Sequence, residues 1–231
     1  MGLVAILALA LAAPAAAPAR GAPPASASGN TAEIVEEVVA VVRNPPGAAP
    51  KVVTLTKLVE EARIALVSRG ATTAATGPLD RAALRAALDW LLDQMLVSDE
   101  AAKLRLDEVG REDLLAELRR FQDRFATFGE YESFLGRAEL SEDELLATLG
   151  RMVRVERYVQ SRVGRAARVR DDDVDRWLRA RGASEAPAAR DAARAQIAAE
   201  RATAQVKELL SELRSRAEIR IIGSLREGEG A

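Results

Sequence analysis

Hydrophobic residues follow two different periods along this chain, and the change between them predicts its secondary structure. Runs rich in β-branched residues occupy Val38–Val42, Lys51–Thr54 and Ile219–Ile222, close to the two ends. Between them, apolar residues recur every three or four positions, which is the period of an amphipathic helix. Because an isolated hairpin is only marginally stable in water, we expect the last strand to join the first two. The sequence therefore predicts a mainly α fold, in which a multi-helix domain carries a small antiparallel sheet.

Capping residues, glycines and prolines divide the first part of the helical region. Thr56 is expected to cap the first helix, which ends before Gly70. The segment Ala71–Gly77 is expected to be a loop. Asp80 then begins a stronger helix, whose apolar residues share one face. That face consists of Leu84, Leu88, Leu91, Leu92 and Met95.

Two further segments are predicted from their apolar spacing. Residues 114–125 suit a helix that places its leucines and phenylalanines on one side, and residues 130–136 suit a short helical piece. Ser141 and Glu144 have the spacing of a capping box, which marks the start of a helix that continues to Gly164.

The last helices are expected to be unequal in length. Asp171 is expected to cap a short helix. Pro187 suits the first turn of a final helix that runs to about Arg216, and its apolar positions become stronger toward Leu213. The predicted closing strand follows it.

Composition removes most catalytic chemistry. The 231 residues include no histidine and no cysteine, which excludes imidazole bases, thiolate nucleophiles and the usual transition-metal ligands. No glycine-rich phosphate loop or serine nucleophile motif is present. The 33 basic side chains are nearly balanced by 35 acidic ones, so the whole chain has no general attraction for nucleic acid. We expect a protein that is not an enzyme and holds no cofactor and no metal.

The N-terminal residues resemble an export signal. An apolar run at residues 2–11 is followed by small residues and prolines, so residues 1–27 are predicted to be a signal peptide and flexible lead-in. Cleavage after Ala19 or Ala27 fits the spacing of small residues. Pro14 and Pro18 interrupt the apolar run, so no stable membrane span is expected after cleavage, although an uncleaved anchor is the alternative. A periplasmic location follows from this prediction.

The rest of the chain is expected to form one domain. No internal repeat and no long linker divides it. We therefore predict a single helical domain over residues 31–223, with its last helix and strand included, and a disordered tail over residues 224–231. A monomer is the default expectation.

Three segments resemble the N-terminal module of SurA-type periplasmic chaperones. They are the strand and asparagine at residues 38–44, the strand and helix start at residues 53–58, and the helical stretch Arg154–Val159. In that family, prolyl isomerase domains of the parvulin type are usually inserted after a segment like Val169–Val174. Here the closing helix follows almost directly, so the resemblance implies a chaperone module without isomerase activity.

The resemblance also implies the kind of partner. It predicts ATP-independent binding of unfolded or extended polypeptides, with outer-membrane proteins as the clients. Two alternatives stay open. The same scaffold could serve as a structural or adaptor protein of the cell envelope with one dedicated partner, or it could be a degenerate isomerase, against which the lack of any parvulin-like segment argues.

The candidate client-binding residues form an aromatic cluster with two nearby methionines, because flexible thioethers and flat rings suit non-directional contacts. Ordinary core packing is the competing interpretation. We favour Phe128, Tyr131 and Phe134 for client contact, because they surround Gly129, and expect Phe121 and Phe125 to be closer to the core. The complete candidate set is Phe128, Tyr131, Phe134, Met95, Met152, Phe121 and Phe125.

Three other features have structural explanations beside functional ones. Trp90 and Trp177 either pack with the indole N–H on a polar partner or form the edge of a groove. The acidic run Asp171–Asp173 lacks the glycine and distal glutamate of a calcium loop, so helix capping explains it better. The basic run at residues 162–170 suits a solvated helix C-terminus better than a lipid-binding or client-binding patch.

Overall fold

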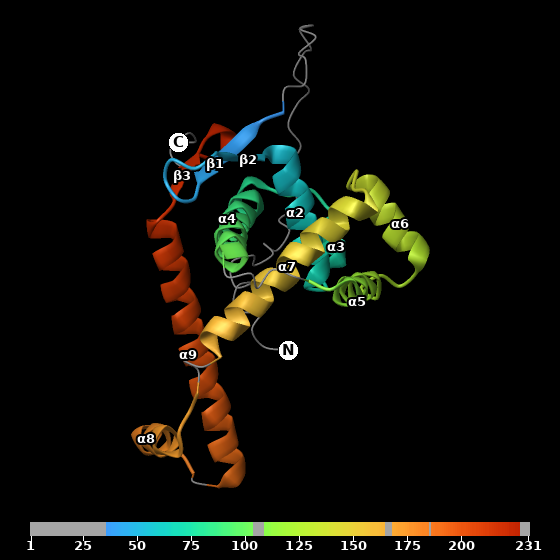
Figure 1. The fold of residues 1–231 in the computed structure, drawn as a ribbon. Coiled ribbons are helices and arrows are strands. Elements are labelled where there is room, and N and C mark those ends of the chain that lie inside the picture. The colour runs from blue at the N-terminus through green and yellow to red at the C-terminus, as the bar shows by residue number, and fades with distance from the viewer. Residues whose placement is uncertain (1–35, 104–108, 165–167, 185, 227–231) are drawn as a thin grey trace, which may run out of the picture.

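The computed structural model describes residues 36–103, 109–164, 168–184 and 186–226. Within these residues the chain is mainly helical and has one small antiparallel sheet, which confirms the predicted fold class. The predicted export signal in residues 1–27 lies outside the described residues. Figure 1 shows a helical body with the sheet at one end and a long last helix that extends out of the body.

The sheet joins the two ends of the chain as predicted. Its strands are β1 (Val38–Arg43), β2 (Lys51–Thr54) and β3 (Glu218–Ile221). β1 lies in the middle and pairs antiparallel with both neighbours, in the order β2-β1-β3. Val42 of β1 and Val53 of β2 are buried at 1% and 2% exposure, whereas Val52 on the opposite face is 52% exposed. One face of the sheet therefore covers the core and the other faces outward.

Glu37 connects the start of the sheet to the residues that follow its last strand. Its backbone carbonyl accepts a hydrogen bond from the Leu55 amide at 2.8 Å, and its carboxylate accepts one from the Ser224 amide at 2.6 Å. Gly223 has φ +64°, and a Cβ there would lie 2.5 Å from the Glu37 carboxylate oxygen. Leu225 lies in a short 3-10 turn and is buried. The ordered chain therefore continues past residue 223, and the predicted tail boundary is wrong.

The first helix follows directly from the sheet. α2 (Leu55–Ser68) is capped by Thr54, whose side chain accepts a hydrogen bond from the Lys57 amide at 3.3 Å. The predicted cap at Thr56 is wrong because Thr54 still has extended backbone angles, so the helix begins at once and Thr56 lies inside its first turn.

The predicted loop after α2 contains one helical turn, α3 (Thr72–Thr76). The Ala75 amide donates to the Ala71 carbonyl at 3.0 Å, and the Ala75 side chain is completely buried. Burial against α2 favours the turn although its sequence, rich in threonine and flanked by glycines, predicted a loop.

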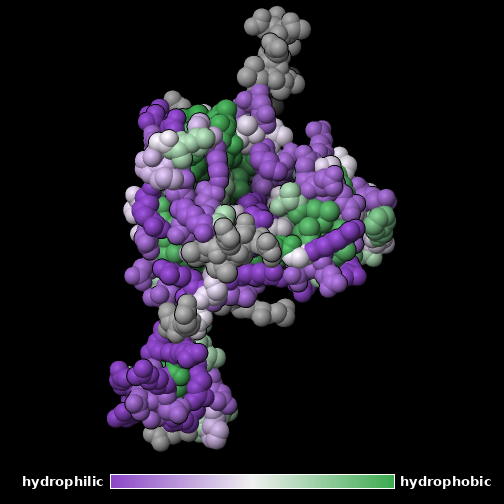
Figure 2. All heavy atoms as spheres, in the orientation of Figure 1, coloured by the Kyte–Doolittle hydropathy of each residue, from purple (hydrophilic) through white to green (hydrophobic). Residues whose placement is uncertain are grey.

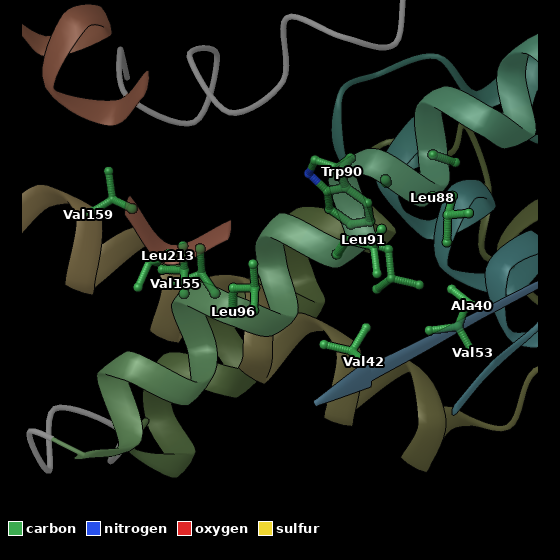
Figure 3. Close-up of a cluster of buried hydrophobic side chains, with 14 of the residues drawn as sticks. Ala40, Val42, Val53, Leu88, Trp90, Leu91, Leu96, Val155, Val159 and Leu213 are labelled. Carbon is green, nitrogen blue, oxygen red and sulfur yellow. The ribbon is translucent and has the colours of Figure 1, made fainter. Parts of the chain in front are cut away.

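Three long helices and the sheet form the main core. They are α4 (Arg81–Lys103), α7 (Glu142–Val163) and α9 (Pro187–Ser215). The Asp80 side chain accepts from the Ala83 amide at 2.7 Å, and the capping box of Ser141 and Glu144 is present, so both predicted helix starts are confirmed. Figure 3 shows side chains of these helices and of β1 and β2 meeting in one apolar cluster. Leu88, Leu96 and Leu213 are among its buried members.

A second core lies on the other side of α7. α5 (Arg111–Gln122) and α6 (Phe128–Arg137) pack there with α2, α3 and the first half of α7. The predicted short helical piece at residues 130–136 is confirmed and is slightly longer than expected. We call α5, α6 and the first half of α7 the side lobe.

The last part of the described structure is an extension of the body. α8 (Asp171–Arg181) packs on the N-terminal half of α9, and Val174, Leu178, Ala193 and Ile197 form a small separate apolar cluster between them. Figure 1 shows this unit projecting from the body, and we call α8 with residues 187–201 of α9 the arm. Pro187 begins α9 as predicted.

The predicted cap of α8 is displaced by one residue. Arg170 occupies the cap position, and Asp171 is the first helical residue. The Asp173 carboxylate accepts from the Arg170 amide at 3.1 Å, so an acid does stabilise this helix start, but from inside the first turn.

Glu37 gives the closure of the sheet a pH dependence. Hydrogen bonds from the backbone N–H and the side chain of Ser224 hold the pKa of Glu37 below its ordinary value. A carboxylate with a lowered pKa in the folded state stabilises the fold above its unfolded pKa, about 4.3, and this contribution is lost as the pH falls through the folded pKa. We expect Glu37→Gln to lower the melting temperature at pH 7, with the difference from the parent protein shrinking below about pH 4.

Thermal melts at a series of pH values would measure this difference. Glu36→Gln is the matched control, since Glu36 is exposed and directly precedes Glu37. Equal effects of the two substitutions at pH 7 would contradict the role of Glu37.

Candidate functional site

The predicted aromatic cluster is mostly a core. Phe121, Tyr131 and Phe134 are 2%, 2% and 1% exposed, and Phe125 is partly buried against them. Phe121 and Phe134 have ring centroids 5.9 Å apart, and Phe125 and Phe134 have centroids 5.4 Å apart. Such tilted ring pairs are typical of packed interiors. Tyr131 and Phe134, two of the favoured candidates for client contact, are therefore buried, because α6 turns both rings toward Phe121 of α5.

Phe128 differs from its neighbours. It is the first residue of α6, directly after the Thr127 cap, and its side chain is 63% exposed. One side of its ring contacts Tyr131, with centroids 5.6 Å apart. Of the favoured candidates, Phe128 is therefore the one that a partner can reach. Leu115 of α5 is also exposed, at 41%.

The two methionines are partly buried. Met95 packs against the main core, and Met152 packs against both the main core and the second core. Their positions on neighbouring apolar faces agree with the sequence pattern, but their side chains serve the contact between the cores. The structure does not bring them together with Phe128 on one open surface.

An open apolar groove lies between α5 and α7 and was not predicted. Its volume is about 650 Å³, and it lies between Leu114 of α5 and the residues Leu146, Ala147 and Gly150 of α7. Gly150 is buried, and a Cβ there would approach Leu114 to 3.6 Å, so the missing side chain leaves space beneath the groove. Figure 2 shows apolar surface over this side of the body. We call this feature the lobe groove.

Charged residues border the lobe groove. Arg154 lines one end of it. Arg157 of α7 pairs with Asp113 of α5 at 2.6 Å, and this partner holds the pKa of Asp113 below its ordinary value. The ion pair ties the two helices together beside the groove. The arrangement is a groove lined mainly by aliphatic and small residues, with charged side chains at its border.

Two buried carboxylates of the body are paired with arginines. Glu61 of α2 is 3% exposed, pairs with Arg151 of α7 and accepts a hydrogen bond from the Thr148 hydroxyl at 3.2 Å. Asp93 of α4 pairs with Arg214 of α9 at 2.6 Å, and burial raises the pKa of Asp93 while Arg214 opposes the shift. These contacts join helices, because a buried charge requires a partner.

A second hollow lies on the arm between α8 and α9. Its volume is about 420 Å³, and Trp177 and Arg181 of α8 face a floor of small residues, Ala189, Ala192 and Ala193, on α9. The Arg181 guanidinium lies over the Trp177 ring at 4.0 Å from its centroid. Trp177 therefore forms the edge of a hollow, whereas Trp90 is a core residue at 5% exposure. We call this feature the arm hollow.

Ion pairs fix α8 against α9. Arg194 pairs with Asp171, Arg190 pairs with Asp175, and Arg201 pairs with Asp173 at 2.9 Å. Asp171 and Asp173 of the acidic run therefore pair with arginines of α9. Asp173 also stabilises the start of α8 through its bond from the Arg170 amide. No group of three potential metal ligands occurs among the residues that the structure describes.

The basic run at residues 162–170 is only partly described. Arg162 is exposed near the end of α7, and Arg165 lies outside the described residues. The Arg168 carbonyl accepts a hydrogen bond from the Arg201 guanidinium at 2.6 Å. Among the described helices, none is both long enough and apolar enough to cross a membrane.

Sequence analysis missed both concave surfaces because small residues create them. Ala147 and Gly150 stand next to the strong core positions Leu145 and Leu149, and their lack of bulk was the only available signal. The alanines of α9 recur at helical spacing, which predicted a weakly apolar, exposed half of the helix rather than the floor of a hollow.

Comparisons with family models, with curated proteins and with solved structures found no match to this chain. The geometry of the two concave surfaces and the resemblance to SurA-type chaperones are the observations that bear on function.

Phe134 and Phe128 allow a buried ring and an exposed ring of the same helix to be compared by mutation. We expect Phe134→Ala to lower the free energy of unfolding by about 3–5 kcal/mol, because it leaves a cavity among packed rings. Phe128→Ala should lower it by about 1 kcal/mol or less, since its ring is mainly exposed. Urea titrations followed by circular dichroism would measure both values, and similar losses for the two variants would contradict this assignment.

The ion pairs between α8 and α9 predict that salt destabilises the arm and leaves the main core unaffected. Exposed pairs contribute up to about 1 kcal/mol each and are screened by salt, so we expect about 1 M NaCl to raise amide exchange in α8 by roughly fivefold. Hydrogen exchange measured by mass spectrometry would show this in α8 peptides. Peptides from α4 in the main core are the internal control, and an unchanged rate in α8 would show that the pairs do not hold the arm together.

Proposed function

We propose that this protein is an exported, ATP-independent chaperone-like protein that binds unfolded or extended polypeptides. It acts in the periplasm, without prolyl isomerase activity, and its clients are outer-membrane proteins. The observation that carries the proposal is the open lobe groove, with its apolar floor of Leu114, Leu146 and Ala147. The resemblance to the N-terminal module of SurA-type chaperones supports it.

The lobe groove suits an extended segment. An extended chain places alternate side chains on opposite sides, so one set can enter an apolar groove while the other set faces water. Strands of outer-membrane barrels alternate in this way over roughly ten residues. The groove is open and its floor is made of small and aliphatic residues, which select for apolar character rather than for one sequence.

The border of the groove suits weak and reversible binding. Leu115 of α5, which follows the groove residue Leu114 in the chain and is 41% exposed, offers contact area without directional bonds. Arg154 at one end and the pair of Arg157 with Asp113 supply charge at the border. Charges at a border change encounter rates more than affinity, so binding should be fast and promiscuous.

Aggregation of a client tests the proposal. We expect the chain from Thr31 to Ala231, at stoichiometric amounts, to reduce light scattering when a urea-unfolded outer-membrane β-barrel protein is diluted into buffer. Ala147→Glu should require at least about threefold more protein for the same reduction, because it places a charge on an apolar floor, and desolvating that charge is unfavourable.

Ala199→Glu is the matched control for this substitution. Ala199 is an exposed residue of α9 and lines neither the lobe groove nor the arm hollow. Circular dichroism would establish that all three proteins are folded. A folded parent protein that leaves scattering unchanged would overturn the proposal and favour the dedicated adaptor. If Ala147→Glu and Ala199→Glu lose the same share of the parent's effect on scattering, the lobe groove is not the client-binding site.

A further inference from the structure

Trp177 lines the arm hollow, and its indole N–H has no acceptor in the part of the chain that the structure describes. The Nε1 atom of Trp177 is buried and has no hydrogen-bond partner among the described residues. A buried N–H without an acceptor is unfavourable, so a ligand that offers an acceptor gains binding energy there. The ring itself lines the hollow, and the exposed Arg181 side chain lies over one face of it.

Small residues make up most of the remaining lining of the arm hollow. Ala189, Ala192 and Ala193 form a floor that leaves room for a ligand rather than filling the space. At the border, the Gln196 amide donates one hydrogen bond to the Glu200 carboxylate at 2.8 Å. The hollow therefore offers a flat ring, a shallow apolar floor and donors in Trp177 and Arg181.

This set of groups matches the chemistry of a proline-rich segment. A polyproline II chain exposes its carbonyl oxygens, has no internal hydrogen bonds and carries no N–H at its prolines. Grooves that bind such chains place aromatic rings against the proline rings and donate hydrogen bonds to the carbonyls.

The hollow is also held in place before any ligand arrives. α8 is fixed to α9 by the ion pairs of Asp171, Asp173 and Asp175 with three arginines of α9. The buried cluster of Val174, Leu178 and Ile197 packs directly behind them. A preformed surface loses little conformational entropy on binding, which favours a ligand that is itself stiff.

We propose that the arm hollow binds a proline-rich, extended polypeptide segment, with the Trp177 indole N–H donating to a backbone carbonyl and Arg181 moving off the ring. The inference rests on the proposed polypeptide-binding function and adds a second contact point for the same clients, selective for proline-rich stretches. The alanines of α9 set the depth of the site. The indole N–H of Trp177 orients the bound segment by donating to one of its carbonyls.

Tryptophan fluorescence tests this proposal. Trp90 and Trp177 are the two tryptophans of the chain, and Trp90 is buried in the main core. In a Trp90→Phe variant of the chain from Thr31 to Ala231, we expect a ten-residue polyproline peptide to change the emission of Trp177 in a saturable way. A glycine–serine peptide of the same length should bind at least about tenfold more weakly, and an equal response to both peptides would overturn the selectivity.

If the Trp90→Phe variant does not fold, titration calorimetry of the protein with both tryptophans present tests the same proposal. We expect Ala192→Glu, which changes an exposed alanine of the arm hollow, to abolish the heat of polyproline binding. Ala199→Glu, at an exposed alanine of α9 that lines neither the arm hollow nor the lobe groove, is the matched control and should leave that heat unchanged. No saturable heat with the parent protein, or equal losses in both variants, would overturn the assignment of the arm hollow.

The two proposals fail in different ways. If the parent protein suppresses aggregation but binds no polyproline peptide, the arm inference falls and the chaperone-like function stands. If polyproline binds at the arm hollow but scattering of the outer-membrane protein is unchanged, the hollow is a peptide site and the client class proposed above is wrong.

Discussion

Backbone pairing along β1 holds the two ends of the described chain together, and the positions of the helices follow from it. β2 pairs with one edge of β1 directly after the proline-rich turn, while β3 pairs with the other edge, and Arg43 of β1 contacts Glu218 of β3 across a separation of 175 residues. A hairpin of β1 and β2 alone would be marginal in water. The third strand and the apolar inner face stabilise the sheet, which covers one end of the main core.

The closure also fixes the path of α9. Because β3 follows α9 almost directly, the C-terminal half of this helix must lie beside α4, where Arg214 pairs with Asp93 at 2.6 Å and donates to the Asp89 carbonyl at 3.0 Å. The N-terminal half then extends beyond the body as one continuous helix and carries α8. The arm is thus positioned by the same helix that leads into the last strand. Because α9 also packs with α7 in the main core, the helices that carry the two concave surfaces are joined through that core.

Much of the fold was predictable because its signals are local. The β-branched runs at residues 38–42 and 51–54, the capping box at Ser141 and Pro187 at a helix start each act within a few residues, and the structure contains each of them. The errors arose where tertiary contacts decide. Ala75 is helical because α2 buries it, and Leu225 is ordered because it packs beneath the sheet, although the sequence around both residues predicted irregular chain.

The candidate site was less predictable, since sequence pattern cannot distinguish a ring that faces a neighbouring helix from one that faces water. Tyr131 and Phe134 lie three residues apart on α6 and face α5, whereas Phe128, a further three residues before Tyr131, lies at the helix start and remains exposed. The concave surfaces depend on side chains that are small, such as Gly150 and Ala192, and small residues carry little signal in a hydrophobic pattern.

The position of β3 in the chain has a consequence for the order of folding during synthesis. Ribosomes add residues from the N-terminus, so β1, β2 and most helices are complete long before the residues of β3 exist. Until then one edge of β1 has no strand beside it, and an unpaired edge can pair with another chain. Contacts between residues so far apart in sequence also form slowly. The nascent protein therefore passes through a stage in which it is itself an open-edged, incompletely folded chain.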